Sequence, residues 1–417
     1  MYMPSQTPSY PEFSFENLYK AYVNCRKRKR KTYHSMKFEE NCEFELLKLQ
    51  RELRNHTYLP SRSICFVVTK PTLREVFAAN FRDRIVHHLL YNFMEPVFEP
   101  KFVNGSYACR KNKGSSKSVK DLRKCLNKIT QNHHKKTYFL HLDVKGFFMS
   151  LKKEILFKMI TKQIKNPEIL RLAKVVIFHD PTQNFTAKSD KSLFAKIPPY
   201  KSLFHNPSDQ GLPIGNLTSQ FFANVYLNEI DQFAKHNLKI KYYLRYVDDF
   251  LLLSNDKNEL ENWQREIDLF LKEHLGIELN FKKQILEDVD KGIDWLGYII
   301  KPDHILVRKR IVQNFKQKLY FFNQGLRKYP DINKQGQLSL PFEENDPPFE
   351  NIEKILATVN SYFGYFKHAD TFKLRKNLWE TKFQRLENYI EPKGPELLSF
   401  RIKQDFKKKA KTKDKFI

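Results

Sequence analysis

The stretch YLRYVDDFLLLS, Tyr243–Ser254, decides how this chain folds. Apolar and aromatic residues dominate both sides of Asp248 and Asp249, which predicts a β-hairpin with the two aspartates in its turn. Two carboxylates about 4 Å apart repel each other by roughly 4 kcal/mol at an effective dielectric constant near 20. A fold that keeps them side by side needs water or a cation to offset that cost.

A third acidic residue stands at the end of another apolar strand. The segment TYFLHLDVKGFFMSL, from Thr137, predicts a strand that ends at Asp143 and continues toward a helix. If this strand neighbours the hairpin in one sheet, Asp143, Asp248 and Asp249 converge at its edge. Mg²⁺ prefers oxygen ligands, and two such ions about 4 Å apart can activate a hydroxyl and stabilise a leaving pyrophosphate. The alternative for an Asp-Asp pair on its own is an ordinary turn.

Length and charge set the class of protein and of partner. The chain has 417 residues, 41% of them hydrophobic, which is enough for a substantial core and for two to four domains. Lys and Arg number 74 against 47 Asp and Glu, so the net charge is 74 − 47 = +27. Such an excess favours a polyanion as partner, because phosphates that are neutralised release counterions. A basic surface kept for solubility is the alternative.

Cysteines and the N-terminus indicate the compartment. The five cysteines are scattered, with no CxxC pair and an odd total, which predicts reduced thiols in the cytoplasm. The first residues, MYMPSQTPSYPEF, lack the charged and then apolar pattern of a signal peptide. No apolar run approaches the roughly 18 residues that span a bilayer. We therefore expect a cytoplasmic protein without a membrane anchor.

Periodicity predicts helices around the strands. Apolar spacing favours helices at Phe15–Tyr22 and Phe38–Arg54. Between them, the run RKRKRK fits a solvated segment, a nuclear-import signal or a nucleic-acid contact. A polar, Pro-containing stretch, Asp180–Gln210, predicts a surface excursion. The last hundred residues look helical, and the basic tail RIKQDFKKKAKTKDKFI is expected to be disordered at its end.

Five segments in order resemble the motifs of reverse transcriptases. They are LDVKGFFMSL, GLPIGNLTSQ, RYVDDFLLLS, LGIELNFKKQ and DWLGYII, and the resemblance covers most of the chain. It implies an α+β right-hand polymerase fold, with fingers, a palm whose antiparallel sheet lies on helices, and a helical thumb. The implied division is a basic segment and fingers at 1–136, a palm at 137–300 with a fingers excursion at about 151–210, a thumb at 301–392 and a basic tail at 393–417.

The resemblance also implies roles for individual residues. Asp143, Asp248 and Asp249 would be catalytic and would bind two Mg²⁺ ions, for which Mn²⁺ can substitute, with the carbonyl of Val144 as a further ligand. Phe148 would exclude a 2′-hydroxyl, whereas a simple core aromatic is the alternative reading. Lys283 would donate a proton to pyrophosphate, with Lys282 as its rival. The implied nucleotide-binding residues are Lys70, Arg74, Phe148, Ile214, Gly215, Gln220 and Lys283, and the implied primer grip is Trp295, Leu296, Gly297 and Tyr298.

The second motif departs from the common pattern of the family. Most relatives have Gln before the Gly and Pro after the Ser, whereas Ile214 and Gln220 occupy those places here. This variant resembles the reverse transcriptases of diversity-generating retroelements, which miscopy a template RNA at adenines. Gln can hydrogen-bond near the nascent pair and Ile cannot, so discrimination worth about 1–3 kcal/mol could be lost. A neutral apolar exchange is the alternative.

The resemblance implies partners and leaves rival functions open. The partners would be a template RNA, the RNA/cDNA hybrid, deoxynucleoside triphosphates and a small, basic, oligomeric accessory protein. The enzyme would be bacterial or phage-encoded. One rival function is a related reverse transcriptase in anti-phage defence. A rival from another class is a catalytically silent RNA-binding protein with the same fold.

Overall fold

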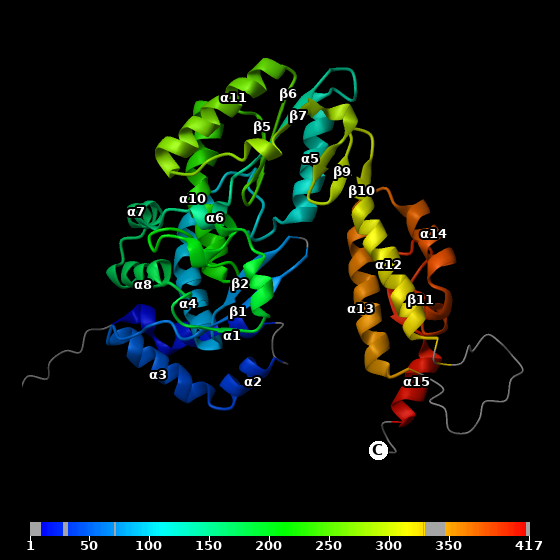
Figure 1. The fold of residues 1–417 in the computed structure, drawn as a ribbon, viewed down its shortest axis with the longest axis horizontal. Helices are drawn as coiled ribbons and strands as arrows, with labels where there is room; N and C mark the ends of the chain where they lie inside the picture. Colours follow the sequence, from blue (N-terminus) through cyan, green and yellow to red (C-terminus); the bar gives the residue numbers. More distant parts are fainter. Residues whose placement is uncertain (1–9, 28–31, 71, 328, 330–346, 414–417) are drawn as a thin grey trace, which may run out of the picture. The chain divides into compact units, whose positions relative to one another are not determined.

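The computed structural model describes residues 10–27, 32–70, 72–327, 329 and 347–413. Most of the RKRKRK run, at 28–31, and the last four residues of the tail lie outside this range, so the hypotheses on them stay open. The chain divides into two compact units, which are described separately. The first comprises residues 1–118 and 138–287, and the second comprises 119–137 and 288–417 (Figure 1).

Helices at the N-terminus of the first unit pack around one long helix. The expected helix over Phe38–Arg54 is wrong as a single element, because Asn41 leaves the helical conformation, with φ −130° and ψ 36°. Buried Leu46, Leu49 and Leu53 join the same apolar cluster as Ile85 and Leu89 of the long helix. These elements are α1 (Phe15–Arg26), α2 (Tyr33–Glu39), α3 (Cys42–Arg54) and α4 (Phe81–Phe98).

The central sheet of this unit has four strands in the order β5-β6-β3-β7. β3 runs antiparallel to β6, with a register from Tyr138 opposite Ser254 to Asp143 opposite Asp249. β5 and β6 form the expected hairpin. The bounds are β3 (Tyr138–Asp143), β5 (Tyr242–Tyr246), β6 (Asp249–Ser254) and β7 (Ile285–Asp288).

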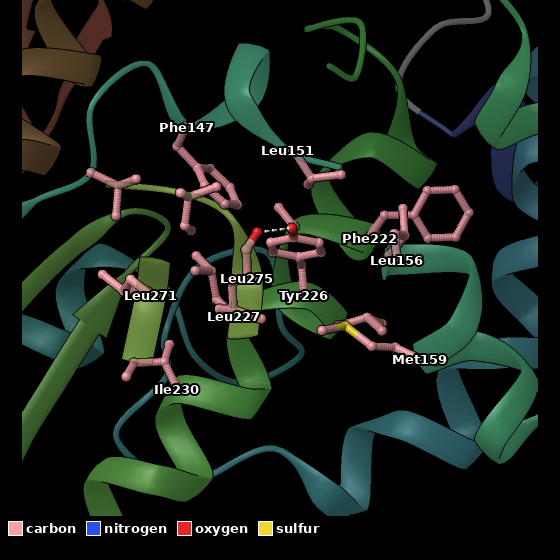
Figure 2. Close-up of a cluster of buried hydrophobic side chains, with 14 of the residues drawn as sticks. Phe147, Leu151, Leu156, Met159, Phe222, Tyr226, Leu227, Ile230, Leu271 and Leu275 are labelled. Carbon is pink, nitrogen blue, oxygen red and sulfur yellow. Dashed lines mark hydrogen bonds between the residues drawn. The ribbon is translucent and has the colours of Figure 1, made fainter. Parts of the chain in front are cut away.

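The largest apolar core contains both strand residues of this sheet and helix residues. Figure 2 shows Phe147, Tyr226, Leu227 and Leu275 within it, and the Tyr226 hydroxyl donates a hydrogen bond to the Leu275 carbonyl. Each such side chain contributes about 1.5–3 kcal/mol when fully buried, so the sheet has a rigid base. Besides α4, the helices that contribute are α6 (Phe147–Ser150), α7 (Lys153–Gln163), α8 (Pro167–Phe178), α10 (Leu217–Gln232) and α11 (Lys257–Phe270).

A second sheet includes part of the predicted surface excursion. β1 pairs antiparallel with β2, and β4, which lies inside the stretch 180–210, pairs parallel with β1. The excursion is therefore anchored in a sheet rather than only looped over the surface. Its bounds are β1 (Ser63–Val68), β2 (Arg74–Ala78), β4 (Phe185–Ala187), α9 (Lys191–Ala195) and the 3₁₀ turns η3 (Pro199–Lys201) and η4 (Leu203–His205).

The second unit combines a small sheet with helices. Its sheet has the order β10-β9-β8, and the expectation of a wholly helical last segment is wrong where Ile390–Pro392 and Phe400–Ile402 pair as a hairpin. In the expected tail, residues 404–413 form α15. The remaining bounds are α5 (Ser115–Ile129, from 119 in this unit), β8 (Ile293–Trp295), β9 (Tyr298–Ile300), β10 (Ile305–Val307), α12 (Lys309–Gly325), α13 (Phe349–Phe366) and α14 (Phe372–Lys382).

None of the helices in the described part of the chain is both long enough and apolar enough to cross a bilayer.

Candidate active site

The turn of the β5–β6 hairpin contains a residue in a strained conformation. Val247 has φ 56°, in the left-handed region. A β-branched residue there is a true outlier and costs about 1–2 kcal/mol. The guanidinium of Arg245 donates a hydrogen bond of 3.0 Å to the Val247 carbonyl. The hydrogen bond from Arg245 thus stabilises the turn that carries Asp248.

Arg245 itself lies in a fully buried polar network. Its guanidinium contacts both carboxylate oxygens of Asp231 on α10, at 2.6 and 2.7 Å. It also donates to Asn224 at 3.3 Å and to Ser106 at 3.0 Å. Burial acts to lower the pKa of Arg245, but the charge of Asp231 raises it overall, so the guanidinium stays charged. Sequence reasoning missed these residues, although an arginine inside an apolar strand signals a buried partner.

The structure brings Asp143 next to the hairpin. It lies directly opposite Asp249 across β3 and β6, where side chains share one face of the sheet. The Asp143 carboxylate accepts from the Lys283 ammonium at 2.8 Å and from the Asn280 amide at 3.0 Å. The Asn280 backbone N–H donates to the Asp143 carbonyl at 2.7 Å. Asn280 is a further residue that the sequence analysis missed.

The residues around Asp248 shift the pKa of its carboxyl group. Burial, followed by the charges of Asp249 and Asp143, raises the pKa of Asp248 to about 7, and Lys283 opposes the shift. A carboxyl with such a pKa is only partly ionised near neutral pH. A cation placed among these oxygens would stabilise its charged form.

The donor set suits a hard divalent cation, but the side chains are not arranged around one. Among the described residues, no group of three or more His, Cys, Asp or Glu side chains is placed so that it could hold a metal ion. Two of the three carboxylates have other partners. Lys283 occupies the Asp143 carboxylate, and His141 Nε2 lies 3.4 Å from Asp249 Oδ1. Carboxylate oxygens are ligands that Mg²⁺ prefers, so the chemistry of the donors fits this ion although their arrangement does not surround one. The predicted ligand Val144 is buried and forms a β-bridge with Leu279.

Phe148 and Ile214 both pack against one small apolar core. Phe147 is buried, whereas Phe148 next to it is only partly buried, and Ile214 packs with Phe148 against a core that includes Phe77. Gly215 has φ 127°, and a Cβ there would lie 2.7 Å from the Phe77 carbonyl. The loop around Ile214 therefore lies directly on β2.

The remaining predicted nucleotide contacts lie at the surface of the first unit. Lys70 is exposed, and the exposed Arg74 donates to Thr72 Oγ1 at 2.6 Å. The Gln220 side-chain carbonyl accepts from the Cys109 thiol at 3.4 Å. Lys283, rather than its exposed neighbour Lys282, makes the recorded contact with Asp143. Their roles in nucleotide binding stay predictions.

The predicted primer grip is a tight hairpin of the second unit. Leu296 and Gly297 both have positive φ, at 50° and 90°, as the turn between β8 and β9 requires. Trp295 and Tyr298 are buried, and the ring of Tyr298 stacks on Tyr365 with centroids 4.4 Å apart. Because these two side chains serve the core of this unit, a contact with a primer would fall to the turn itself.

Comparison with known proteins assigns the family. Residues 68–300, more than half of the chain, match the model of the reverse transcriptase (RNA-dependent DNA polymerase) family. This chain belongs to the reverse transcriptase family. Its fold is the α+β right-hand polymerase fold, and residues 68–300 form an RNA-dependent DNA polymerase domain.

Relatives of this reverse transcriptase include intron-encoded proteins. Protein YkfC of Escherichia coli K12 is 24% identical over 300 residues, covering 64% of this chain and 72% of YkfC. The group II intron-encoded protein LtrA of Lactococcus lactis subsp. cremoris is 20% identical over 324 residues, covering 62% of this chain and 50% of LtrA. The chain thus spans only half the length of LtrA. Among solved structures, apo telomerase from Candida tropicalis is similar over 59% of this chain and 55% of that chain, at 14% identity and a TM-score of 0.42.

Proposed function

We propose that this reverse transcriptase copies a template RNA into cDNA at the site formed by Asp143, Asp248 and Asp249. The observation that carries the proposal is the register of β3 and β6, which sets Asp143 opposite Asp249 and beside the Asp248 turn. β3 and the β5–β6 hairpin are far apart in the sequence, yet they bring three carboxylates to the same end of the sheet. Like charges placed so close together repel each other, so such a cluster needs a compensating charge. Such a cluster is suited to phosphoryl transfer.

The chain's own residues have separate roles in this proposal. Asp143, Asp248 and Asp249, with the Val144 carbonyl, would hold two Mg²⁺ or Mn²⁺ ions, which supply activation of the primer hydroxyl and neutralisation of the leaving pyrophosphate. Burial and the neighbouring aspartates raise the pKa of Asp248 to about 7, and a bound cation would stabilise the ionised carboxylate and lower that pKa. In the absence of one, Lys283 supplies the positive charge at Asp143.

Lys283 is also suited to protonate pyrophosphate. Partial burial acts to lower its pKa, but the hydrogen bond to Asp143 and the three aspartate charges raise it above the ordinary value. The ammonium therefore carries its proton at neutral pH. Its release from Asp143 would leave that proton available to an incoming triphosphate, whose other contacts we assign to Lys70, Arg74, Gly215 and Gln220.

We further propose that copying is error-prone at template adenines, as in a diversity-generating retroelement. Ile214 supports this proposal because it packs against the same apolar core as Phe148, and its side chain has no atom that can hydrogen-bond. Without a directional bond near the nascent pair, discrimination rests on dispersion contacts alone. A structured template RNA and a small basic accessory protein complete this proposal.

Primer extension on a defined RNA with Mg²⁺ tests the polymerase. Asp248→Asn should lower the extension rate by about a thousandfold or more, because a neutral amide cannot hold the cation. Asp290→Asn is the matched control, because Asp290 is an exposed aspartate outside the carboxylate cluster. Equal rates for the wild type and Asp248→Asn would contradict the proposal.

Sequencing the cDNA tests the diversity-generating role separately. Errors concentrated at template adenines are expected. Errors spread evenly over the four template bases would remove that role and leave the polymerase assignment standing.

A further inference from the structure

A surface cleft of about 300 Å³ lies beside α6, within the first unit. The catalytic aspartates do not line it, and neither does Phe148. One wall comes from the turn before α6, another from the excursion after β4, and the floor from residues 276–278. Polar and aromatic side chains dominate the lining, which includes Lys145, Ser150, Tyr200, Asn206, Gln210 and Glu278.

The walls of this cleft are fixed to each other by backbone contacts. Gly146 has φ 56°, and a Cβ there would lie 2.9 Å from the Tyr200 carbonyl. The Asn206 side-chain amide donates to the Met149 carbonyl, and Gln210 forms a β-bridge with Lys152. A preformed cleft binds a ligand without the cost of ordering its own walls.

Tyr200 offers an aromatic surface at the edge of the cleft. Tyr200 is 55% exposed as a whole residue, although its backbone carbonyl lies against Gly146. The Lys201 ammonium lies 5.3 Å from the centroid of the Tyr200 ring. An aromatic ring beside a cation is a recurrent platform for an unstacked base.

The rest of the excursion is basic. Residues 185–210 contain four lysines and two aspartates, and one of the aspartates, Asp190, caps α9. Lys188, Lys191 and Lys196 are all exposed. Inside the cleft, Gln210 and Ser150 add an amide and a hydroxyl that can bond to a base edge or a 2′-hydroxyl.

We propose that this cleft binds an unpaired nucleotide of single-stranded RNA. The base stacks on Tyr200, and the flanking phosphates lie along the lysines of the excursion. A volume of about 300 Å³ is at the small end of ligand pockets, which suits one nucleotide. The inference rests on the proposed function, because it makes the cleft a contact for the template RNA away from the carboxylates. An acidic protein segment would leave the stacking surface and the amides without a role.

Fluorescence anisotropy with a labelled 12-nucleotide oligo(U) measures this binding. The full chain is first saturated with an unlabelled, blunt-ended RNA/DNA duplex that has no unpaired nucleotide, so that the carboxylate site is occupied by a duplex and the proposed cleft stays free. Tyr200→Ala should weaken oligo(U) binding about tenfold, the size of one lost stacking contact. Tyr200→Phe should bind as the wild type does. Tyr19→Ala, which removes a 48% exposed tyrosine of α1, is the matched control and should change nothing.

Two further measurements address the position of the RNA and the lysines. Oligo(4-thiouridine) should cross-link to the peptide that contains Tyr200. The double variant Lys196→Ala/Lys201→Ala should reduce the slope of log affinity against log salt concentration by an amount equivalent to about two phosphate contacts. The proposal would be overturned if Tyr200→Ala bound oligo(U) as tightly as the wild type, or if the cross-links were confined to other peptides. Either result is expected if the cleft contacts a protein instead of RNA.

The two proposals fail in different ways. Tyr200→Ala should keep primer extension on a preannealed duplex, whereas Asp248→Asn should lose extension and keep oligo(U) binding. If the wild type does not bind oligo(U), this inference is wrong and the polymerase proposal still stands.

Discussion

Asp143 and Asp249 lie directly opposite each other on antiparallel strands β3 and β6. Side chains alternate between the faces of a sheet, so a slip of one residue would move one aspartate to the other face. The apolar residues that surround them in both strands resist such a slip, because it would expose the buried Leu140, Leu142 and Leu252. The register of the core thus sets the acidic cluster.

Phe148→Ala should admit ribonucleotides. The Phe148 ring is only partly buried, so part of it is free to meet a sugar, whereas Phe147 fills the core. Competition between a deoxynucleotide and its ribonucleotide in primer extension gives the selectivity, which should fall at least tenfold. Phe147→Leu is the control, because it should lower stability by about 1 kcal/mol and keep selectivity. Unchanged selectivity in Phe148→Ala would place the gate elsewhere.

Ile214→Gln should reduce misincorporation opposite adenine more than opposite the other bases. The new amide would lie against the apolar core that Phe148 also contacts and could hydrogen-bond near the nascent pair. Deep sequencing of cDNA from one RNA containing all four bases provides the error spectrum, and Ile214→Leu is the apolar control. A uniform change at all four bases would refute the role of Ile214.

Arg245→Met should destabilise the protein by about 3–5 kcal/mol, because it leaves Asp231 charged and buried. The double variant Arg245→Met/Asp231→Leu should recover much of that loss. Urea denaturation of the wild type, both single variants and the double variant gives the coupling free energy. Purely additive effects would show that the pair does not act as a unit.

Glu75→Gln should change how stability depends on pH. Burial raises the pKa of Glu75, although Ser202 and Leu203 donate hydrogen bonds to its carboxylate. A raised folded-state pKa favours the protonated form, so its stabilisation is present below the ordinary pKa and is lost as pH rises through the raised one. The urea midpoint of Glu75→Gln should therefore gain on that of the wild type from pH 4 to pH 8. A constant difference over this range would contradict the assignment.

Local patterns predicted the elements that carry the candidate site. The apolar residues around Asp248 and Asp249 predicted the hairpin, and the apolar run before Asp143 predicted a strand, whose place beside the hairpin was only a condition for the three acids to converge. These signals are short, nearly continuous apolar runs, which can be read directly from the letters.

Features that depend on distant partners escaped prediction. Nothing near Arg245 in the sequence identifies Asp231 on α10 as its partner, and Asn280 lies 137 residues from the carboxylate that it holds. The pairing of β4 with β1 likewise joins residues more than a hundred positions apart. The break at Asn41 was missed for another reason, because helical apolar spacing continues on both sides of it.

Glu75 connects the excursion to β2 through Ser202 and Leu203, and two residues along the same strand the Phe77 N–H donates to the Ile214 carbonyl at 2.8 Å. The excursion, β2 and the loop around Ile214 are therefore joined by one continuous series of hydrogen bonds. Shortening the excursion would remove contacts that hold β2, and β2 in turn holds Ile214, the residue proposed to set copying accuracy. Trimming this chain for engineering would thus alter its error spectrum, even where every acidic ligand were kept.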